Sequence, residues 1–216
     1  TGKITDPFRT IQHALDIVAV DGKVNLGTGV YDEYDIIWPN KDNLTLKASN
    51  ESSVCTVDAG TSGRCMLITY EVNATIESIT FRDGNVNGDA GGAIKFFNTN
   101  YSATSESLPV IRITGCKFFN NNCYDNTNWW GGAVYIHGYH SLITNCLFQD
   151  NTSDLIDPTL GAAAGGLVVE SRIGSAGGLC NVNVTNCLFY HNRGGFGGGA
   201  ALYFNNYVTV ESCTFV

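Results

Sequence analysis

The chain has 216 residues and 44% of them are hydrophobic, which is enough to bury the core of one elongated domain. Its formal net charge is −8 with only 12 Lys and Arg residues. A protein surface that binds nucleic acid or an anionic membrane needs clustered positive charge, so we expect neither as a partner. No apolar run approaches the roughly 20 residues of a membrane-spanning helix, so we expect no direct membrane insertion in this segment.

Residues 1–22 predict one amphipathic helix that caps a stack of strands. Asp6 suits the N-cap and Pro7 the first helical position. Apolar residues then recur at helical spacing until Gly22: Phe8, Ile11, Leu15 and Val18. A stack of strands has an open end with unpaired edges, and a helix from Pro7 to Val18 would cover it.

The rest of the chain is organised as repeats. Residues 23–75 predict irregular first coils, and residues 76–216 contain four units in which an F-x-x-N-like tetrad precedes a Gly-Gly-hydrophobic tetrad. The paired tetrads are 81–84 with 91–94, 118–121 with 131–134, 148–151 with 165–168, and 189–192 with 198–201. A fifth unit begins at Cys213 and breaks off. We therefore expect the chain to continue in a longer protein or to be covered there by a partner.

Alignment of the units on their Phe gives two more columns of inward side chains. One lies two residues before the Phe and contains Ile79, Cys116, Cys146, Cys187 and Cys213; the other contains Ile76, Ile113, Ile143, Val184 and Val210. Spacing by two indicates a strand, and the three-residue step between these columns indicates a bend. The Gly pair, which allows tight bending or positive φ, leads into a third strand.

Two parallel-sheet folds compete, a βαβ protein and a β-helix. Segments between strands, such as 99–108 and 152–164, lack a helical apolar stripe, so crossover helices are not expected. The sequence predicts an all-β fold, a right-handed parallel β-helix (solenoid) with an N-terminal capping α-helix, as a single domain over residues 1–216.

The paired F-x-x-N and G-G-A-[ILV] tetrads resemble the repeat signature of the polymorphic outer-membrane protein family, whose passenger domains resemble the pectin-lyase-like β-helix. The likeness covers residues 76–216, with Gly84 and Leu167 as departures, and residues 6–15 and 29–33 are similar to the start of many secreted β-helix proteins. The resemblance implies a secreted or cell-surface role in adhesion or in building an extracellular layer.

Eight cysteines raise the question of disulfides. The four in the inward column point the same way in successive coils, which is poor geometry for a bond, so we expect buried thiols. Cys55 and Cys65 flank a turn, and a disulfide between them is one alternative. A disulfide between Cys123 and Cys180, which lie in loops, is another. No spacing of Cys and His predicts a metal site.

N-glycosylation sequons are consistent with an exported protein. They occur at Asn43, Asn50, Asn73, Asn100, Asn151 and Asn183, the last within an expected strand. The tetrad residues Asn121, Asn151 and Asn192 also predict a stacked ladder in which side-chain amides bond to the backbone of the turns. Asn145 and Asn186 predict a shorter second ladder.

Carboxylates are the residues on which an enzymatic function would depend. The best cluster, Asp150, Asp154 and Asp157, lies on one loop, with Arg172 later in the same repeat. It suits adventitious calcium, or the site of a polysaccharide lyase or glycoside hydrolase. An enzyme should carry two or more acids and a base on one face of neighbouring coils, whereas the strand faces beside the Cys and Phe columns show mainly Thr, Asn and Gly.

Aromatic residues supply the alternative, a binding site. Trp129 and Trp130, with Tyr124 nearby, lie in an Asn-rich loop and could form a platform for a sugar or a partner protein. His137 and His140 lie on either side of a turn, and we expect both to be surface histidines. The sequence thus favours a non-catalytic extracellular β-helix with no cofactor, binding carbohydrate, a surface protein or neighbouring copies; the alternative is a pectin-lyase-like lyase or hydrolase.

Overall fold

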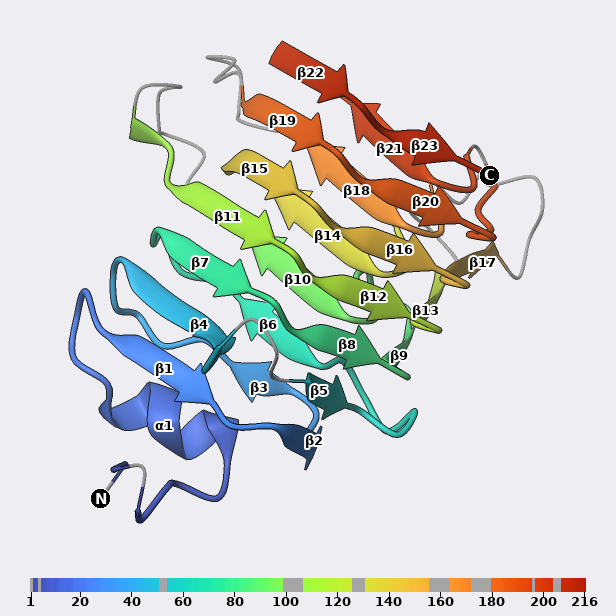
Figure 1. Cartoon of the computed structure of the whole chain (residues 1–216). Coiled ribbons are helices and arrows are strands. Elements are labelled where there is room, and N and C mark those ends of the chain that lie inside the picture. The colour runs from blue at the N-terminus through green and yellow to red at the C-terminus, as the bar shows by residue number, and fades with distance from the viewer. Residues whose placement is uncertain are drawn as a thin grey trace.

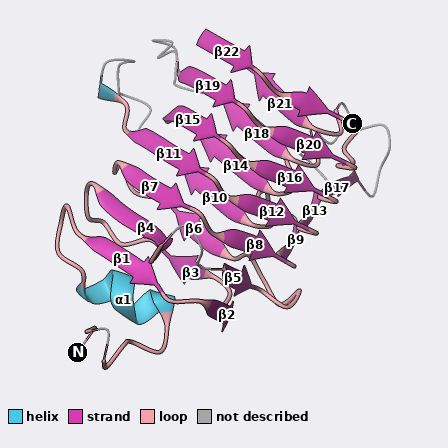
Figure 2. Cartoon of the chain, viewed as in Figure 1, coloured by secondary structure: helices cyan, strands magenta, loops and turns pink. Residues whose placement is uncertain are grey.

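The computed structural model describes residues 2–3, 5–50, 54–98, 107–125, 131–155, 164–171, 180–195, 197–203 and 207–216. In these ranges the chain is all-β apart from helix α1 (Ile11–Ile17), and its sheets are parallel. Figure 1 shows the strands stacked coil upon coil from the N-terminal helix to the C-terminus, and Figure 2 shows strands throughout the stack. This arrangement is consistent with a β-helix or solenoid, and the single helix lies at one end of it.

Three long sheets and one short sheet contain the strands. The first sheet consists of β1 (Lys23–Leu26), β4 (Leu44–Ala48), β7 (Ala74–Glu77), β11 (Val110–Thr114), β15 (His140–Thr144), β19 (Asn181–Thr185) and β22 (Tyr207–Glu211). The second consists of β2 (Gly29–Asp32), β5 (Cys55–Asp58), β8 (Thr80–Arg82), β12 (Lys117–Phe119), β16 (Leu147–Gln149), β20 (Leu188–Tyr190) and β23 (Thr214–Phe215). The third consists of β3 (Ile36–Ile37), β6 (Met66–Ile68), β10 (Ile94–Phe97), β14 (Val134–His137), β18 (Leu167–Glu170) and β21 (Ala200–Tyr203). The fourth, which the sequence did not predict, consists of β9 (Asn85–Asn87), β13 (Asn122–Asp125) and β17 (Thr152–Leu155).

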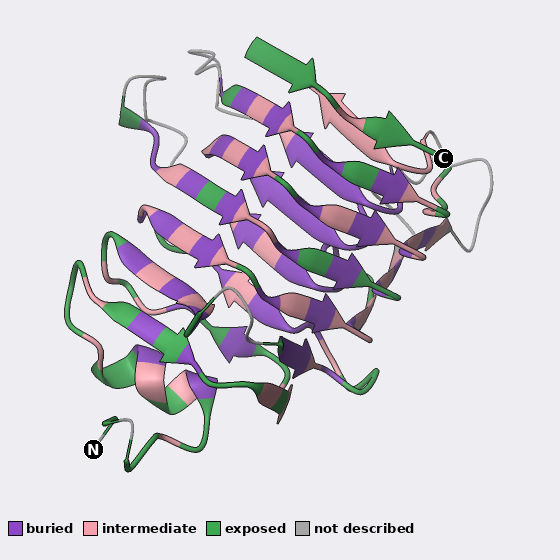
Figure 3. Ribbon diagram, in the orientation of Figure 1, coloured by how far each residue is buried: buried purple, intermediate pink, exposed green. Residues whose placement is uncertain are grey.

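The register of the strands confirms the columns found in the sequence. Phe81, Phe118, Phe148, Phe189 and Phe215 are partners in successive strands of the second sheet. Their rings stack with centroids 4.7 to 5.6 Å apart. Figure 3 shows buried and less buried residues alternating along the strands of the first sheet, except in the last strand, β22, which is exposed along its length. One inward side chain per strand therefore repeats at the spacing of parallel strands and builds a continuous core.

Single residues in the left-handed region turn the chain at two corners of each coil. Between the first and second sheets these are Ser78, Gly115, Asn145, Asn186 and Ser212, with φ from 52° to 64°. After the second sheet they are Asp83, Asn120, Asp150 and His191, with φ of 53° or 54°. Gly, Asn and Asp adopt this region at least cost, so the expected bend between the first two strands is confirmed and has a local cause.

A ladder of buried amides holds the second corner. The side-chain amide of Asn121 donates to Oδ1 of Asn151 (3.0 Å) and to the carbonyl of Phe81 (3.1 Å). Asn151 in turn donates to Oδ1 of Asn192 (2.8 Å) and to the carbonyl of Phe118 (2.9 Å). The predicted Asn ladder is confirmed, and each rung joins one coil to the next. Asn186 also donates to Asn145 (2.7 Å), as the second ladder requires.

The Gly pairs serve close approach between coils more than positive φ. Among them only Gly91 has a positive φ, 69°. A Cβ on Gly165 would lie 2.4 Å from the carbonyl oxygen of Asn151, and one on Gly92 would lie 2.5 Å from that of Asn122. The Gly-Gly tetrad thus passes directly over the backbone at the end of an F-x-x-N tetrad, which explains why the two tetrads occur together.

Helix α1 is shorter than the sequence predicted. It begins after Thr10, whose Oγ1 accepts from the backbone N–H of His13, so neither Asp6 nor Pro7 starts it and Phe8 lies outside it. The Glu33 carboxylate accepts from the backbone N–H groups of Ile11 (2.6 Å) and of the next residue (3.2 Å). A carboxylate from another coil thus supplies the acceptors of the first turn, and this tertiary contact could not be seen in local sequence. Ile11 and Leu15 are buried as expected.

All eight cysteines are free thiols, and seven of them are buried. Cys55 donates to the carbonyls of Leu26 and Gly27, whereas Cys65 donates to that of Arg82, so the bridge considered between Cys55 and Cys65 is absent. Cys123 and Cys180 are likewise unbridged. In the inward column each sulfur donates to a carbonyl of the preceding coil, such as Cys146 to Ile113 and Cys187 to Ile143. The expected free thiols in this column are confirmed.

Candidate functional site

The outer face of the third sheet is enclosed at β14, where all four residues are buried, whereas outward residues of β3 and β10 in the same sheet are exposed or half-buried. Tyr135 and His137 alternate with the inward residues Val134 and Ile136 of β14, yet only 1% and 2% of their surfaces are exposed. Outward residues of the second sheet, such as Lys117, are exposed. Outward faces of stacked strands are usually in contact with solvent. A buried polar and aromatic cluster on such a face is therefore the strongest candidate for a functional site.

A carboxylate connects the polar groups of this cluster. The hydroxyl of Tyr135 donates to Oε2 of Glu170 (2.5 Å), and Nδ1 of His137 lies 3.5 Å from the same oxygen. Neither ring nitrogen of His137 has a hydrogen-bond partner among the described residues. A buried imidazole without partners costs free energy of folding, so its presence needs a reason beyond packing.

Two aromatic rings lie near the imidazole. The ring of Phe97 lies 4.9 Å from that of His137, and the ring of Tyr135 lies 6.4 Å away. Tyr203 is the register partner of Glu170 on the next strand. Burial, followed by the charge of Glu170, raises the pKa of the Tyr203 phenol to about 12. At neutral pH this phenol is thus a proton donor and not a base.

Paired charges border the cluster on the side of β10. The amine of Lys95 is bonded to Asp89 and lies 4.7 Å from the centroid of the Phe97 ring. Arg64 contacts the other oxygen of Asp89 (2.7 Å). Burial alone raises the pKa of the Asp89 carboxyl, but the hydrogen bond from Lys95 and the charge of Arg64 hold it below its ordinary value. Both Lys95 and Arg64 are therefore paired with Asp89.

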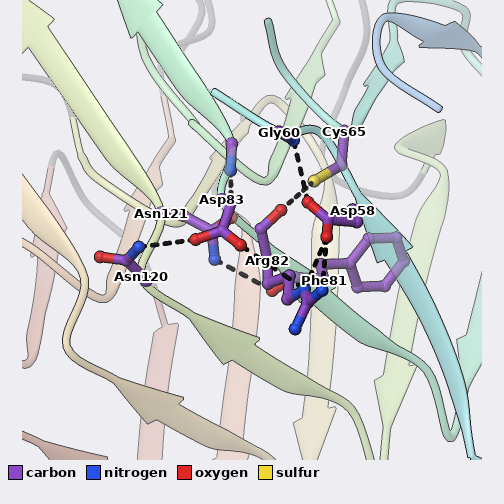
Figure 4. Close-up of polar contacts among 9 residues, drawn as sticks. Asp58, Gly60, Cys65, Phe81, Arg82, Asp83, Asn120 and Asn121 are labelled. Carbon is purple, nitrogen blue, oxygen red and sulfur yellow. Dashed lines mark hydrogen bonds and ion pairs between the residues drawn. The ribbon is translucent and has the colours of Figure 1, made fainter. Parts of the chain in front are cut away.

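A second polar cluster lies on the outer face of the second sheet (Figure 4). The guanidinium of Arg82 bonds Oδ2 of Asp58 through two nitrogens, at 2.5 and 2.8 Å, and lies 3.5 Å from Asp83. Asn120 of the next coil donates to Asp83 (2.6 Å). Asp32 is the register partner of Asp58, so two acids and a basic residue follow one another in a row along β2, β5 and β8. The sequence alignment missed this row because it began at residue 76.

The acids nominated from the sequence are not on one loop. Asp150 lies at a left-handed corner and faces the imidazole of His191 at 3.7 Å, whereas Asp154 is within strand β17 and bonds Arg193 (2.6 Å). The loop assignment was wrong because the residues after the F-x-x-N tetrad pair as the fourth sheet. Asp157 and Arg172 lie outside the described residues, so the nominated cluster is not assembled from described groups.

The nominated aromatic platform is only partly described. Tyr124 is the register partner of Asp154 and of Asn87 in the fourth sheet, so the structure brings Tyr124 and Asp154 together on adjacent strands. Trp129 and Trp130 lie outside the described residues. They directly precede Gly131, which leads into β14 and the His137 cluster.

The sequons fall into different environments. Asn151 is fully buried and both its amide hydrogens are used in the ladder, so the expectation of glycosylation there is wrong for the folded chain. Asn73 uses its side chain to join Asp42 and the backbone of Val110. The others are as follows: Asn43 is exposed and donates to Asp21, Asn50 is exposed, Asn183 is in β19, and Asn100 lies outside the described residues.

The sequence misassigned the key histidine. His137 is not a surface residue, whereas His140 is half-buried and its Nδ1 accepts from the backbone of Asn181. A signal was present in the strand that follows each Gly pair. Its outward positions carry Lys95 and Phe97, then Tyr135 and His137, then Val168 and Glu170, then Ala201 and Tyr203, all in register.

Two further findings bear on the class of protein. Within the described ranges, no helix has the length and apolar character needed to cross a membrane. Among the same residues, no three His, Cys, Asp or Glu side chains gather as they would around a metal ion. Comparison of the chain with family models, curated proteins and solved structures gave no match, so the site has to be interpreted from its own chemistry.

Proposed function

We propose that the chain is a non-catalytic extracellular or cell-surface module, an adhesin or surface-assembly element built as a right-handed parallel β-helix. Strands stacked in register make a rigid rod, and segments between strands are free to vary in sequence without disturbing the core. Its partners in this proposal are a carbohydrate, a surface protein or neighbouring copies of the module.

The observation that carries the proposal is that outward acids among the described residues, including the nominated Asp150 and Asp154, are paired with basic residues of the stack. Asp58 and Asp83 share Arg82, Asp154 bonds Arg193, and Asp150 faces His191, each across at least one coil boundary or corner. A glycoside hydrolase instead needs two carboxylates that converge on the substrate, with one of them poised to give up a proton.

Arg82 also does not suit the role of a base in a lyase. The hydrogen bond and charge of Asp58 raise the pKa of the Arg82 guanidinium, so it stays protonated. The row of Asp32, Asp58 and Arg82 therefore meets the pattern expected of an enzyme in residue type but lacks a group able to accept a proton from the sugar.

Recognition in this proposal resides in the segments between strands. Trp129 and Trp130 remain the proposed aromatic contacts there, with calcium at Asp150, Asp154 and Asp157 as a proposed accessory ion. Glycosylation is proposed at Asn43, Asn50, Asn73 and Asn100. Secretion or display at the cell surface is part of the same proposal.

A polysaccharide lyase or hydrolase is the second candidate, and one observation favours it. His137 is an imidazole without hydrogen-bond partners among the described residues and lies 3.5 Å from the Glu170 carboxylate, whose neighbour on the next strand, Tyr203, keeps its phenol protonated. A base, a group that orients it and an acid are the parts that proton abstraction next to a sugar carboxylate requires. The burial of Tyr135 and His137 argues against this second candidate.

The test is to incubate the purified secreted chain with neutral and acidic polysaccharides, with and without calcium, and to follow reducing ends and unsaturated products. We expect no turnover. Turnover that is lost in both His137→Ala and Glu170→Gln, but kept in the control Asp154→Asn, would replace the proposal with the enzyme. A glycan array and a partner pull-down, repeated with Trp129→Ala and Trp130→Ala, test the binding role.

A further inference from the structure

Three consecutive strands of the second sheet carry an outward row of two aromatic residues with a glutamine between them. Phe119, Gln149 and Tyr190 are register partners on β12, β16 and β20 and point outward, opposite to the buried Phe column. Phe119 is 41% exposed. These strands lie side by side in Figure 1. The row therefore runs along the axis of the stack, with Phe119 exposed and Gln149 and Tyr190 half-buried.

The spacing of the two aromatic residues is set by the fold. Parallel neighbours are about 4.8 Å apart, so Phe119 and Tyr190, two strands apart, are separated by about 9.6 Å. This is close to the length of one disaccharide unit in an extended β-linked polysaccharide, in which every second sugar presents the same face. Aromatic rings stack on the apolar faces of sugars, so two rings at this separation match alternate sugars of one chain.

Polar and aliphatic rows flank the aromatic row and suit the rest of a sugar. On one side are the corner residues Asn120, Asp150 and His191; Gln149 already donates to Asp150 (3.0 Å), and the His191 ring stacks on Tyr190 with centroids 3.8 Å apart. On the other side are Leu147 and Leu188, register partners on β16 and β20. Amide, carboxylate and imidazole groups bond to hydroxyls, and the leucines cover C–H groups.

Charge selects among polysaccharides. Asp83 and Asp150 lie along the polar row, the cation Arg82 is held by Asp58 and Asp83, and the chain as a whole carries −8. Lys117 is a single cation at one end of the aliphatic row. Such a surface repels uronate chains and accepts uncharged ones.

We propose that the outer face of β12, β16 and β20 binds an extended neutral β-linked polysaccharide, which lies along the stack with one sugar over Phe119 and the second sugar after it over Tyr190. This rests on the proposed function, because it names the ligand class of a non-catalytic binding module. It adds a binding site on the strands themselves to the recognition that the proposed function assigns to the segments between strands.

The test uses affinity electrophoresis of the full chain in gels that contain a soluble β-1,4-linked neutral glucan, and in gels that contain polygalacturonate. We expect retardation by the glucan only. Phe119→Ala and Tyr190→Ala should each weaken binding at least tenfold, whereas Tyr34→Ala, at an exposed tyrosine elsewhere, should leave it unchanged. Circular dichroism verifies that each variant is folded.

A double variant tests the spacing itself. Phe119→Ala with Gln149→Tyr restores two aromatic residues but places them on adjacent strands, so binding should stay lost. Restored binding, undiminished binding in the single variants, preference for polygalacturonate, or no binding of the glucan by the unaltered chain would each overturn the proposal. Cleavage of the glucan would instead contradict the non-catalytic function, so the two failures are distinguishable.

Discussion

The side chain of Asn151 accepts two hydrogen bonds from Asn121, one from its backbone N–H and one from its amide, both at 3.0 Å. Asn151 repeats this arrangement with the next rung, and it donates to the backbone of the coil before it. One amide thus satisfies groups in three coils, at a corner where the strand ladder is interrupted. The fourth letter of the F-x-x-N tetrad is fixed by this requirement, since only a short amide donates and accepts in both directions.

Asn151→Ala should lower the free energy of unfolding by about 1 to 3 kcal/mol, because it leaves buried backbone and amide groups of both neighbouring coils without partners. Urea unfolding followed by circular dichroism measures the loss. Asn25→Ala is the matched control, since Asn25 is exposed on β1, and it should change stability by no more than about 0.5 kcal/mol. Equal effects of the two substitutions would show that the ladder contributes nothing.

The sequence predicted the structural features that recur in every coil and missed contacts that occur once. The Phe, Cys and Asn columns recur with small gaps, so their alignment specifies the register of the core. The start of α1 was wrong because Glu33, about twenty residues away, supplies the acceptors for the first turn. The enclosed state of His137 was missed because alternation along a strand distinguishes inward from outward residues, and does not reveal that an outer face is covered.

The site was harder to predict than the fold for a related reason. Asp58, Arg82 and Asp83 come from coils 23–75 and 76–216, and only the register of β5 with β8 brings them together. The nominated acids, by contrast, were grouped because they are close in sequence. In a stacked fold, residues one coil apart are closer than residues a few positions apart on the same strand.

Gly165→Ala should destabilise the chain by about 1 to 3 kcal/mol, because the new Cβ would lie 2.4 Å from the carbonyl of Asn151 and 2.5 Å from that of Arg193, forcing backbones apart. Thermal unfolding of the variant measures this. Gly27→Ala is the control, since its Cβ would lie 3.9 Å from the hydroxyl of Tyr31, at an ordinary van der Waals distance. An unchanged melting temperature for Gly165→Ala would contradict the close-approach explanation of the Gly pair.

The buried thiols should make the fold sensitive to alkali. Burial raises the pKa of the Cys116 thiol to about 12 from an ordinary value of 9.0. The unfolded chain therefore loses this proton first, so the stability that the buried thiol contributes is fully present below pH 9.0 and is lost as the pH rises toward 12. The loss should approach 1.4 kcal/mol per pH unit for one such thiol.

Urea unfolding under reducing conditions at a series of alkaline pH values checks this. Cys116→Val should make the fall in stability with pH shallower, whereas Cys213→Val, at a partly exposed position, should change it less. Under native conditions near neutral pH, Cys116 and Cys146 should resist alkylation until the chain unfolds, which mass spectrometry detects. Rapid labelling of either thiol in the folded chain would show that the column is open to solvent.

Helix α1 should protect one end of the stack from association. Leu15 is fully buried and belongs to the main core, so Leu15→Ser should expose that core and the edges of β1 and β3, and should give aggregation in light scattering. Ile17→Ser is the control, because Ile17 is 53% exposed on the same helix. If Leu15→Ser stayed monomeric with an unaltered melting temperature, α1 would not be a cap.

His137 should be a residue that the fold would be more stable without. Its two ring nitrogens have no hydrogen-bond partner among the described residues, and it is packed against Phe97 and Tyr135. His137→Phe keeps an aromatic ring and removes the unsatisfied polar groups, so it should raise the free energy of unfolding by about 1 kcal/mol. His140→Phe should have the opposite sign, because it removes the acceptor of the Asn181 N–H. Urea unfolding of both variants at neutral pH decides the matter. A loss of stability in His137→Phe as large as that in His140→Phe would mean that the imidazole is bonded in solution, and would turn attention to what it binds.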